Sequence, residues 1–140
     1  MDALSKLLST RDWLMADGAT GTNLFNMGLT AGEPPEFWNI DKPDNIRSLY
    51  RSAVNAGSDI FLTNTFGGNA SRLKLHGAQG RVHELNRIGA SLGREIADAA
   101  GRAGGNFLTA EIAHIARRDV AYREVGALID VDRLVTNCLS

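Results

Sequence analysis

The chain has 140 residues, 44% of them hydrophobic and 22% charged, and a formal net charge of −1 at pH 7. This length is enough for one domain with a core, and the near-neutral charge gives no electrostatic reason to expect nucleic acid or an acidic membrane surface as a partner. Cys138 is the single cysteine, so no disulfide can form within the chain. No apolar run approaches the roughly 20 residues of a transmembrane helix, and the first residues lack the apolar region of a signal peptide. We therefore expect a cytoplasmic protein.

The first element that we expect is a short buried strand over residues 13–16. It ends at Asp17 and Gly18, and a turn of small residues, 19–22, leads toward a helix. A carboxylate at the carboxyl end of a strand, beside a glycine that lets a ligand approach the backbone, is typical of binding sites in α/β proteins. The alternative for Asp17 is a turn or helix-capping role.

A helix and a second strand follow in close succession. Apolar residues recur at helical spacing from Pro43 to residue 54, Pro43 suits a first helical turn, and Gly57 suits a helix end. We expect the strand over residues 59–63. Asn64 and Thr65 then repeat the pattern of polar residues at a strand end, although they could equally satisfy buried backbone groups.

The rest of the chain continues the alternation. We expect a short helix over residues 70–76, a long helix over 81–102 and a third strand over 106–110. Gly89, inside the long helix, is expected to allow close packing onto a sheet. Alternating strands and helices predict an α/β fold made of parallel βαβ units with right-handed crossovers. We assign residues 1–105 to one domain portion and residues 106–140 to a divergent tail with a candidate strand and helices.

Four segments carry a resemblance to a known family: Asp-Gly-Ala-Thr-Gly-Thr at 17–22, Pro-Glu-Phe-Trp-Asn at 35–39, Ala-Gly-Ser-Asp-Ile at 56–60 and Thr-Asn-Thr-Phe at 63–66. In this order and spacing they resemble the homocysteine S-methyltransferase family, which includes betaine–homocysteine methyltransferase and the homocysteine domain of cobalamin-dependent methionine synthase. The resemblance implies a (β/α)₈ TIM barrel. Because a complete barrel needs about 250 residues, this chain would supply only its N-terminal portion, about two to three βα units.

The resemblance also implies an activity, the transfer of a methyl group from betaine or another methylated onium or folate-type donor to the sulfur of homocysteine, which gives methionine. By this resemblance Asp17 would bind the substrate ammonium group. The backbone N–H groups of Gly18 and Ala19 would hold the substrate carboxylate, and Asn64 and Thr65 would line the floor of the site.

The family binds zinc through three cysteines on late barrel strands, and zinc coordination deprotonates the homocysteine thiol. We expect no zinc to be bound by this chain, because Cys138 lacks the paired-cysteine context of the family's metal motif. The histidines form no metal site that we can identify. Residues 110–114 also depart from the Gly-Ser-x-Gly-Pro type motif of the family, as a truncated gene or a shifted reading frame would produce. We therefore expect the chain to be inactive alone.

Trp38 and Phe66 are candidate aromatics of the methyl-donor site, because aromatic faces attract quaternary ammonium groups. The alternative for each is packing in the core or in a lid. Gly67 stands where a betaine-using relative would place an aromatic residue, which leaves the donor open.

Two functions of other classes remain open. One is a non-catalytic fragment that associates with another copy or another chain through an open strand edge. The other is a different βαβ enzyme that uses Asp17 and Asn64 to bind another small polar ligand.

Overall fold

The computed structural model describes residues 8–100 and 108–110. Helices, 3₁₀ helices (η) and strands alternate in the order α2 (Thr20–Asn26), η1 (Pro35–Phe37), α3 (Trp38–Asp41), α4 (Pro43–Asn55), β1 (Ile60–Leu62), α5 (Ala70–Lys74), η2 (Gln79–Arg81), α6 (Val82–Ala100) and β2 (Leu108–Ala110). This alternation agrees with the predicted α/β class. The predicted boundary at residue 105 lies outside the described residues, and so does the predicted tail of residues 106–140 apart from 108–110, with His114 and Cys138.

The strands are parallel. β1 pairs with β2 so that Ile60 lies opposite Leu108. On the other side of β1, Ala16 forms an isolated parallel bridge with Ile60. The three segments therefore lie in the order residue 16, β1, β2, and helices connect each to the next, as expected for βαβ units.

The prediction of a buried first strand over residues 13–16 is wrong. Only the bridge at Ala16 forms, supported by hydrogen bonds from the N–H groups of Asp59 and Ile60 to the carbonyl of Met15 at 2.7 and 3.1 Å. Trp13 is 68% exposed and Met15 40% exposed, because no described element covers these side chains.

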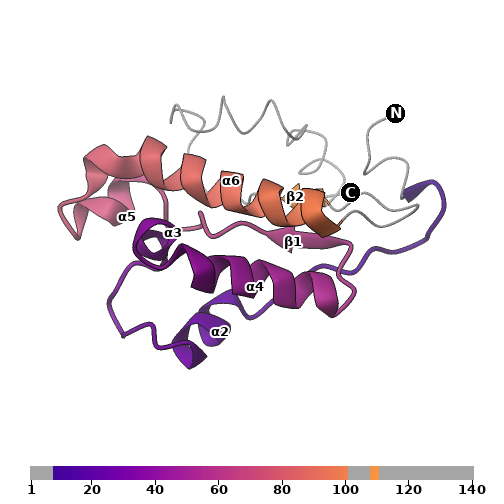
Figure 1. Ribbon diagram of the computed structural model, residues 1–140. Helices are drawn as coiled ribbons and strands as arrows, with labels where there is room; N and C mark the ends of the chain where they lie inside the picture. The colour runs from indigo at the N-terminus through magenta and orange to yellow at the C-terminus, as the bar shows by residue number, and fades with distance from the viewer. Residues whose placement is uncertain (1–7, 101–107, 111–140) are drawn as a thin grey trace.

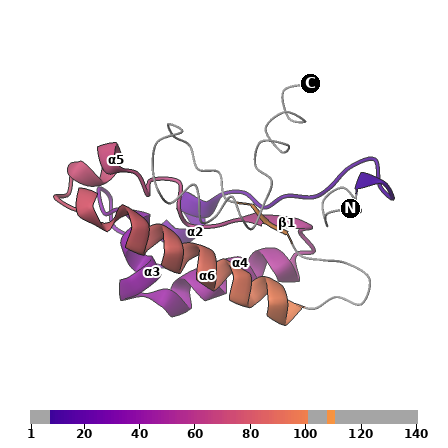
Figure 2. The same cartoon turned by 90° about the horizontal axis from the view of Figure 1, so that it is seen from above.

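Helices α4 and α6 lie side by side and cover the same face of β1 (Figures 1 and 2). In α4, Ile46, Leu49 and Tyr50 are buried, which is the apolar face that the sequence predicts. The Tyr50 ring packs on that of Phe61 in β1, with ring centroids 5.1 Å apart. Gly57, with φ of +91°, ends the turn that leads from α4 into β1.

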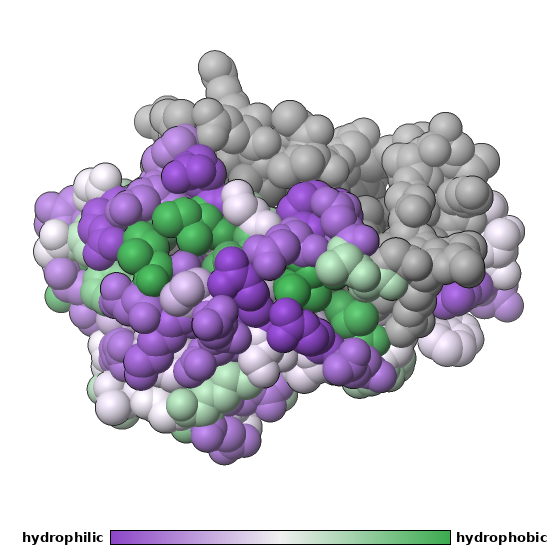
Figure 3. Space-filling model, in the orientation of Figure 1, coloured by the Kyte–Doolittle hydropathy of each residue, from purple (hydrophilic) through white to green (hydrophobic). Residues whose placement is uncertain are grey.

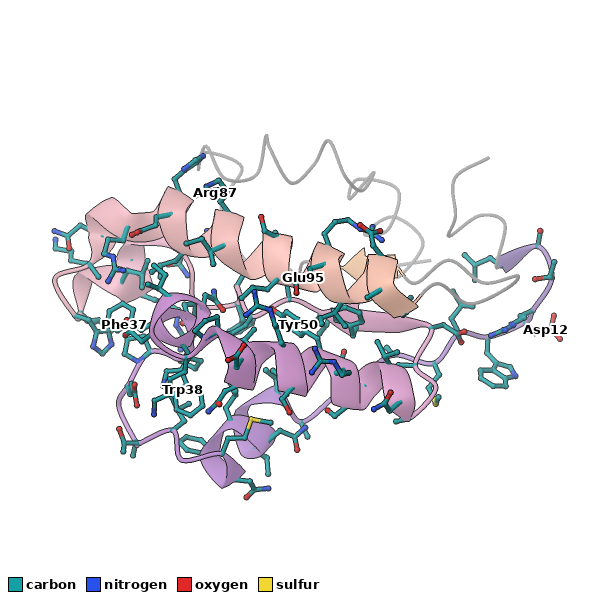
Figure 4. All side chains as sticks on the ribbon, viewed as in Figure 1. Asp12, Phe37, Trp38, Tyr50, Arg87 and Glu95 are labelled. Carbon is teal, nitrogen blue, oxygen red and sulfur yellow. The ribbon has the colours of Figure 1, made fainter. Side chains whose placement is uncertain are left out.

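Polar side chains cover most of the outer face of the two helices, with small apolar areas between them (Figure 3). Arg47 of α4 joins Glu95 of α6 through three N–H to oxygen contacts of 3.0, 3.2 and 3.1 Å. Glu95 lies on the solvent side of the helix pair (Figure 4). An exposed ion pair of this kind contributes about 0–1 kcal/mol, so the apolar faces and not the ion pair hold the helices together. None of the described helices has the length and apolar character needed to cross a membrane.

The segment 35–39 joins α6 to the loop that follows β1. Asn39, which is buried, donates from Nδ2 to the carbonyl of Asn64 at 2.9 Å and to the carbonyl of Leu85 at 3.1 Å. Gly89 makes this approach possible, because a Cβ atom there would lie 2.7 Å from Asn39 Nδ2 and 3.0 Å from Thr65 Cγ2. Gly89 therefore allows close packing as predicted, but against the loop after the strand rather than against the strand itself.

Replacing Asn39 with Ala would leave two buried carbonyl groups, those of Asn64 and Leu85, without this donor. We expect a loss of at least about 2 kcal/mol in the free energy of unfolding, measured by urea denaturation. Asn55→Ala is the matched control at an exposed helix end, and it should change the same quantity by no more than about 0.5 kcal/mol. Equal effects of the two variants would contradict the assignment.

Candidate functional site

Asp17 and the segment 63–65 both follow the carboxyl ends of parallel strands, so they lie at the same end of the sheet. The parallel bridge between Ala16 and Ile60 aligns the two strand ends. The N–H of Asp17 donates to the carbonyl of Ile60 at 3.0 Å, and the N–H of Leu62 donates to Asp17 Oδ1 at 3.0 Å. This edge is the carboxyl end of the parallel strands, where ligands bind in α/β folds.

The Asp17 carboxyl is half-buried. Burial raises its pKa above the ordinary value of 3.8, and the hydrogen bonds from the N–H groups of Leu62 and of Asp17 itself lower the pKa by less. Among the described residues no basic side chain pairs with Asp17. A half-buried carboxylate without a basic partner can bind a ligand ammonium group.

The backbone turns sharply directly after Asp17. Ala19 has φ 57° and ψ 31°, and it is the one non-glycine residue with positive φ in the described part of the chain. This left-handed conformation costs about 1–2 kcal/mol, and such strain is concentrated at functional sites. The N–H groups of Gly18 and Ala19 donate to no described acceptor, and no side chain caps α2. A Cβ atom at Gly18 would meet no atom within 4 Å, so the backbone here is open to a ligand.

Asn64 and Thr65 are both only 3% exposed. Asn64 Nδ2 donates to the carbonyl of Pro35 at 2.8 Å and to Asn39 Oδ1 at 2.9 Å. The hydroxyl of Thr65 shares a hydrogen bond of 2.9 Å with that of Thr63. The two side chains therefore satisfy buried polar groups, which is the alternative left open by the sequence, and they shape the loop beside Asp17.

Trp38 belongs to the core. Its side chain is 0% exposed, Nε1 donates to Glu33 Oε1 at 2.9 Å, and the Lys42 ammonium lies 4.3 Å from the ring centroid (Figure 4). A ring without exposed surface cannot face a donor, so the packing alternative holds for Trp38 and we remove it from the site.

Phe66 is 54% exposed and lies in the loop that begins at the edge beside Asp17. The guanidinium carbon of Arg72 lies 5.4 Å from its ring centroid, within the range of a cation–π contact. Phe66 therefore remains accessible, with one of the protein's own cations beside its ring.

No three His, Cys, Asp or Glu side chains gather closely enough to hold a metal ion within residues 8–100 and 108–110. His76, which the sequence analysis left out of any metal site, packs edge-on against Phe37 with ring centroids 6.3 Å apart. The described residues therefore offer no set of ligands for a zinc ion, and the zinc that the resemblance implies stays a prediction.

Glu36 and Asn39 were not singled out from the sequence, although both lie in the segment 35–39. They are 4% and 1% exposed and hold the loop after β1. Their position inside a family motif was the available signal, but a polar residue in a loop gives no local sign that it is buried.

Comparison with known proteins identifies the family. A family model described as homocysteine S-methyltransferase matches residues 14–129. The chain belongs to the homocysteine S-methyltransferase family. The match extends past residue 105, into the part of the chain that the sequence analysis assigned to a divergent tail.

The alignments of this chain with family members of known function include only part of the chain. Methionine synthase from Mycobacterium tuberculosis is 33% identical over 94 residues, 63% of this chain, and methionine synthase from Mycobacterium leprae is 32% identical over 91 residues, 61% of this chain. The chain spans 8% of the length of each relative.

Solved structures show the same fold. The homocysteine methyltransferase MmuM from Escherichia coli matches with a TM-score of 0.68 in its metallated form and 0.65 in its oxidized form, at 23% identity. Each match covers 79% of this chain and 40% of that protein. At this identity the likeness concerns the fold alone.

Replacing Asp17 with Asn keeps an acceptor for the N–H of Leu62 and removes the half-buried charge. The pKa of Asp17 is raised in the folded state, so its contribution to stability is present below the ordinary value of 3.8 and is lost as the pH rises through the raised pKa. Wild-type stability should therefore fall relative to Asp17→Asn as the pH rises from about 3 to 7, in urea denaturation at each pH. A free energy of unfolding that rises for the wild type relative to Asp17→Asn over this pH range would contradict a pKa of Asp17 raised by burial.

Proposed function

We propose that this chain supplies the N-terminal, substrate-binding part of a homocysteine S-methyltransferase, which forms methionine by methyl transfer to the homocysteine sulfur. One observation carries the proposal: a half-buried Asp17 without a described basic partner stands next to the open N–H groups of Gly18 and Ala19. The ammonium and carboxylate groups of an amino acid share one carbon atom. An acid followed directly by free backbone donors is complementary to that pair of charges.

In this proposal the chain's own residues bind and orient the substrate. Asp17 accepts hydrogen bonds from the ammonium group, and Gly18 and Ala19 donate to the carboxylate. Asn64 and Thr65 act less directly, because their side chains are engaged within the protein and fix the loop that borders the site.

The order residue 16, β1, β2 supports the proposal that these segments are the first strands of an incomplete (β/α)₈ barrel. All three are parallel, and α4 and α6 both pack on one face, as the outer helices of such a barrel do. Its binding edge would be the carboxyl edge that holds Asp17, in agreement with the position of active sites in this fold.

The methyl donor and the metal belong to the complete enzyme in this proposal. In the complete enzyme zinc would keep the homocysteine sulfur deprotonated. We assign no residue of the described chain as a zinc ligand. The donor is betaine or another methylated onium or folate-type compound. The burial of Trp38 removes one of the two aromatics that favoured an onium donor, which leaves Phe66.

Isothermal titration calorimetry with homocysteine tests the binding role. Asp17→Asn should weaken binding by about tenfold to a hundredfold, because a hydrogen bond to a charged group is worth about 1.5–3 kcal/mol. Asp12→Asn is the matched control, because it also removes one carboxylate charge. Asp12 is exposed and lies at the end of the molecule opposite α5 (Figure 4). Homocysteine affinity that is equal in the wild type and in Asp17→Asn would refute the assignment of Asp17.

A second candidate function is self-association, which the exposed side chains next to the Ala16 bridge favour. β1 occupies one edge of this segment, and no described residue pairs with the other edge, where Trp13 is 68% exposed. An unpaired strand edge with apolar side chains can pair with a second copy.

Sedimentation velocity at increasing concentration tests this candidate. We expect a concentration-dependent dimer for the wild type and a shift toward monomer for Trp13→Ser. Leu75, which is 82% exposed at the C-terminal cap of α5, offers the control variant Leu75→Ser, which should leave the dimer unchanged. A wild type that stays monomeric at all concentrations would exclude self-association.

A further inference from the structure

Glu36 is a buried acidic residue that the proposed substrate contacts do not use. It lies in η1, is 4% exposed, and its Oε1 accepts a hydrogen bond of 2.6 Å from the N–H of Gly67. Gly67 follows Phe66 in the loop after β1. The carboxylate of Glu36 therefore reaches across 31 residues of sequence to hold the backbone of the loop beside Asp17.

Glu36 and Gly67 fit one another closely. A Cβ atom on Gly67 would lie 2.8 Å from Glu36 Oε1 and 3.0 Å from Oε2. The φ of Gly67 is not positive, so the backbone conformation alone would accept another residue. A larger residue at position 67 would therefore have to displace the Glu36 carboxylate.

The segment 35–39 thus grips the loop at two points. Asn64 Nδ2 donates to the carbonyl of Pro35 at 2.8 Å at the start of the loop, and Glu36 accepts from Gly67 three residues later. Phe66, which lies between these two contacts, is exposed. The loop follows Leu62, the last residue of β1, whose N–H donates to Asp17 Oδ1. Residues 35–39 therefore hold the loop that follows the strand end bonded to Asp17.

A buried acid is a costly way to hold one N–H group. No basic side chain of the described chain pairs with Glu36, and a buried carboxylate without a cation costs more than a neutral acceptor. Residues that break such a rule are concentrated at functional sites. The hydrogen bond to a carboxylate is also about twice as strong as a neutral one, so it restrains the loop more firmly.

We propose that Glu36 is a positioning residue of the homocysteine site, which acts through Gly67 to fix residues 65–67, the loop that follows the strand end bonded to Asp17. This inference rests on the proposed function and names a residue that controls its affinity without touching the substrate. Without the contact between Glu36 and Gly67, the loop after β1 is less restrained. Part of the binding free energy of homocysteine is then spent on ordering this loop.

Homocysteine titrations of Glu36→Ala and Glu36→Gln provide the test, at a temperature where every variant is folded. Glu36→Ala should weaken binding by at least about tenfold, whereas Glu36→Gln keeps an acceptor oxygen and should stay within about threefold of the wild type. Gly67→Ala displaces the carboxylate and should match Glu36→Ala, which covers the case in which one variant fails to fold. Ile96→Val, about two helical turns along α6 from Gly89, is the control that lowers stability without changing affinity.

Backbone NMR of the same variants separates this inference from the proposed function. In Glu36→Ala the amide signals of Thr65, Phe66 and Leu62 should shift together with that of Gly67, and those amides should exchange faster with solvent. Shifts confined to Gly67 and η1, or homocysteine affinity unchanged in both Glu36→Ala and Gly67→Ala, would overturn the positioning role. A wild type that binds no homocysteine would overturn the proposed function, and the amide shifts would still decide whether Glu36 positions the loop.

Discussion

The parallel alignment of residue 16 with β1 is the constraint on which the site depends. The bridge between Ala16 and Ile60 and the hydrogen bond from the N–H of Leu62 to Asp17 Oδ1 are among the contacts that join these segments, across 44 and 45 residues of sequence. Because parallel strands place their carboxyl ends at one edge, this alignment brings the acid and the loop after β1 together. A shift of one residue would turn Asp17 to the opposite face of the sheet.

Buried polar contacts then define the loop after β1. Asn39 and Asn64 bond to one another in both directions, since each Nδ2 donates to an oxygen of the other residue. Glu36 adds the contact to Gly67, and Gly89 of α6 leaves the space that Asn39 fills. A network in which each member satisfies another specifies one arrangement, because removing one partner leaves a buried group without its hydrogen bond.

The same arrangement limits what the aromatic residues can do. Trp38 is enclosed by the core and by Lys42, while Phe66 is open to solvent beside Arg72. Of these two aromatic residues, only Phe66 therefore has a ring surface that a ligand could reach. The proposal for amino-acid binding therefore rests on the polar residues Asp17, Gly18 and Ala19.

Local sequence patterns determined α4, α6 and β1 to within a few residues. Pro43, the helical spacing of apolar residues and Gly57 are signals carried within 15 residues of chain, which is why they could be interpreted directly. The same holds for the common edge of Asp17 and Asn64, since strand ends follow from strand order in a parallel βαβ unit. The class of the fold and the location of the candidate site were therefore available from the sequence.

Only the tertiary structure decided which of these side chains are free. The inward direction of Asn64 and the contact of Glu36 with Gly67 depend on residues 25 and 31 positions away. The exposure of Trp13 and the burial of Trp38 depend on which elements pack against them. A motif specifies which residue stands at a position. Burial and hydrogen-bond partners arise from the packing of distant segments, and no local pattern encodes that packing.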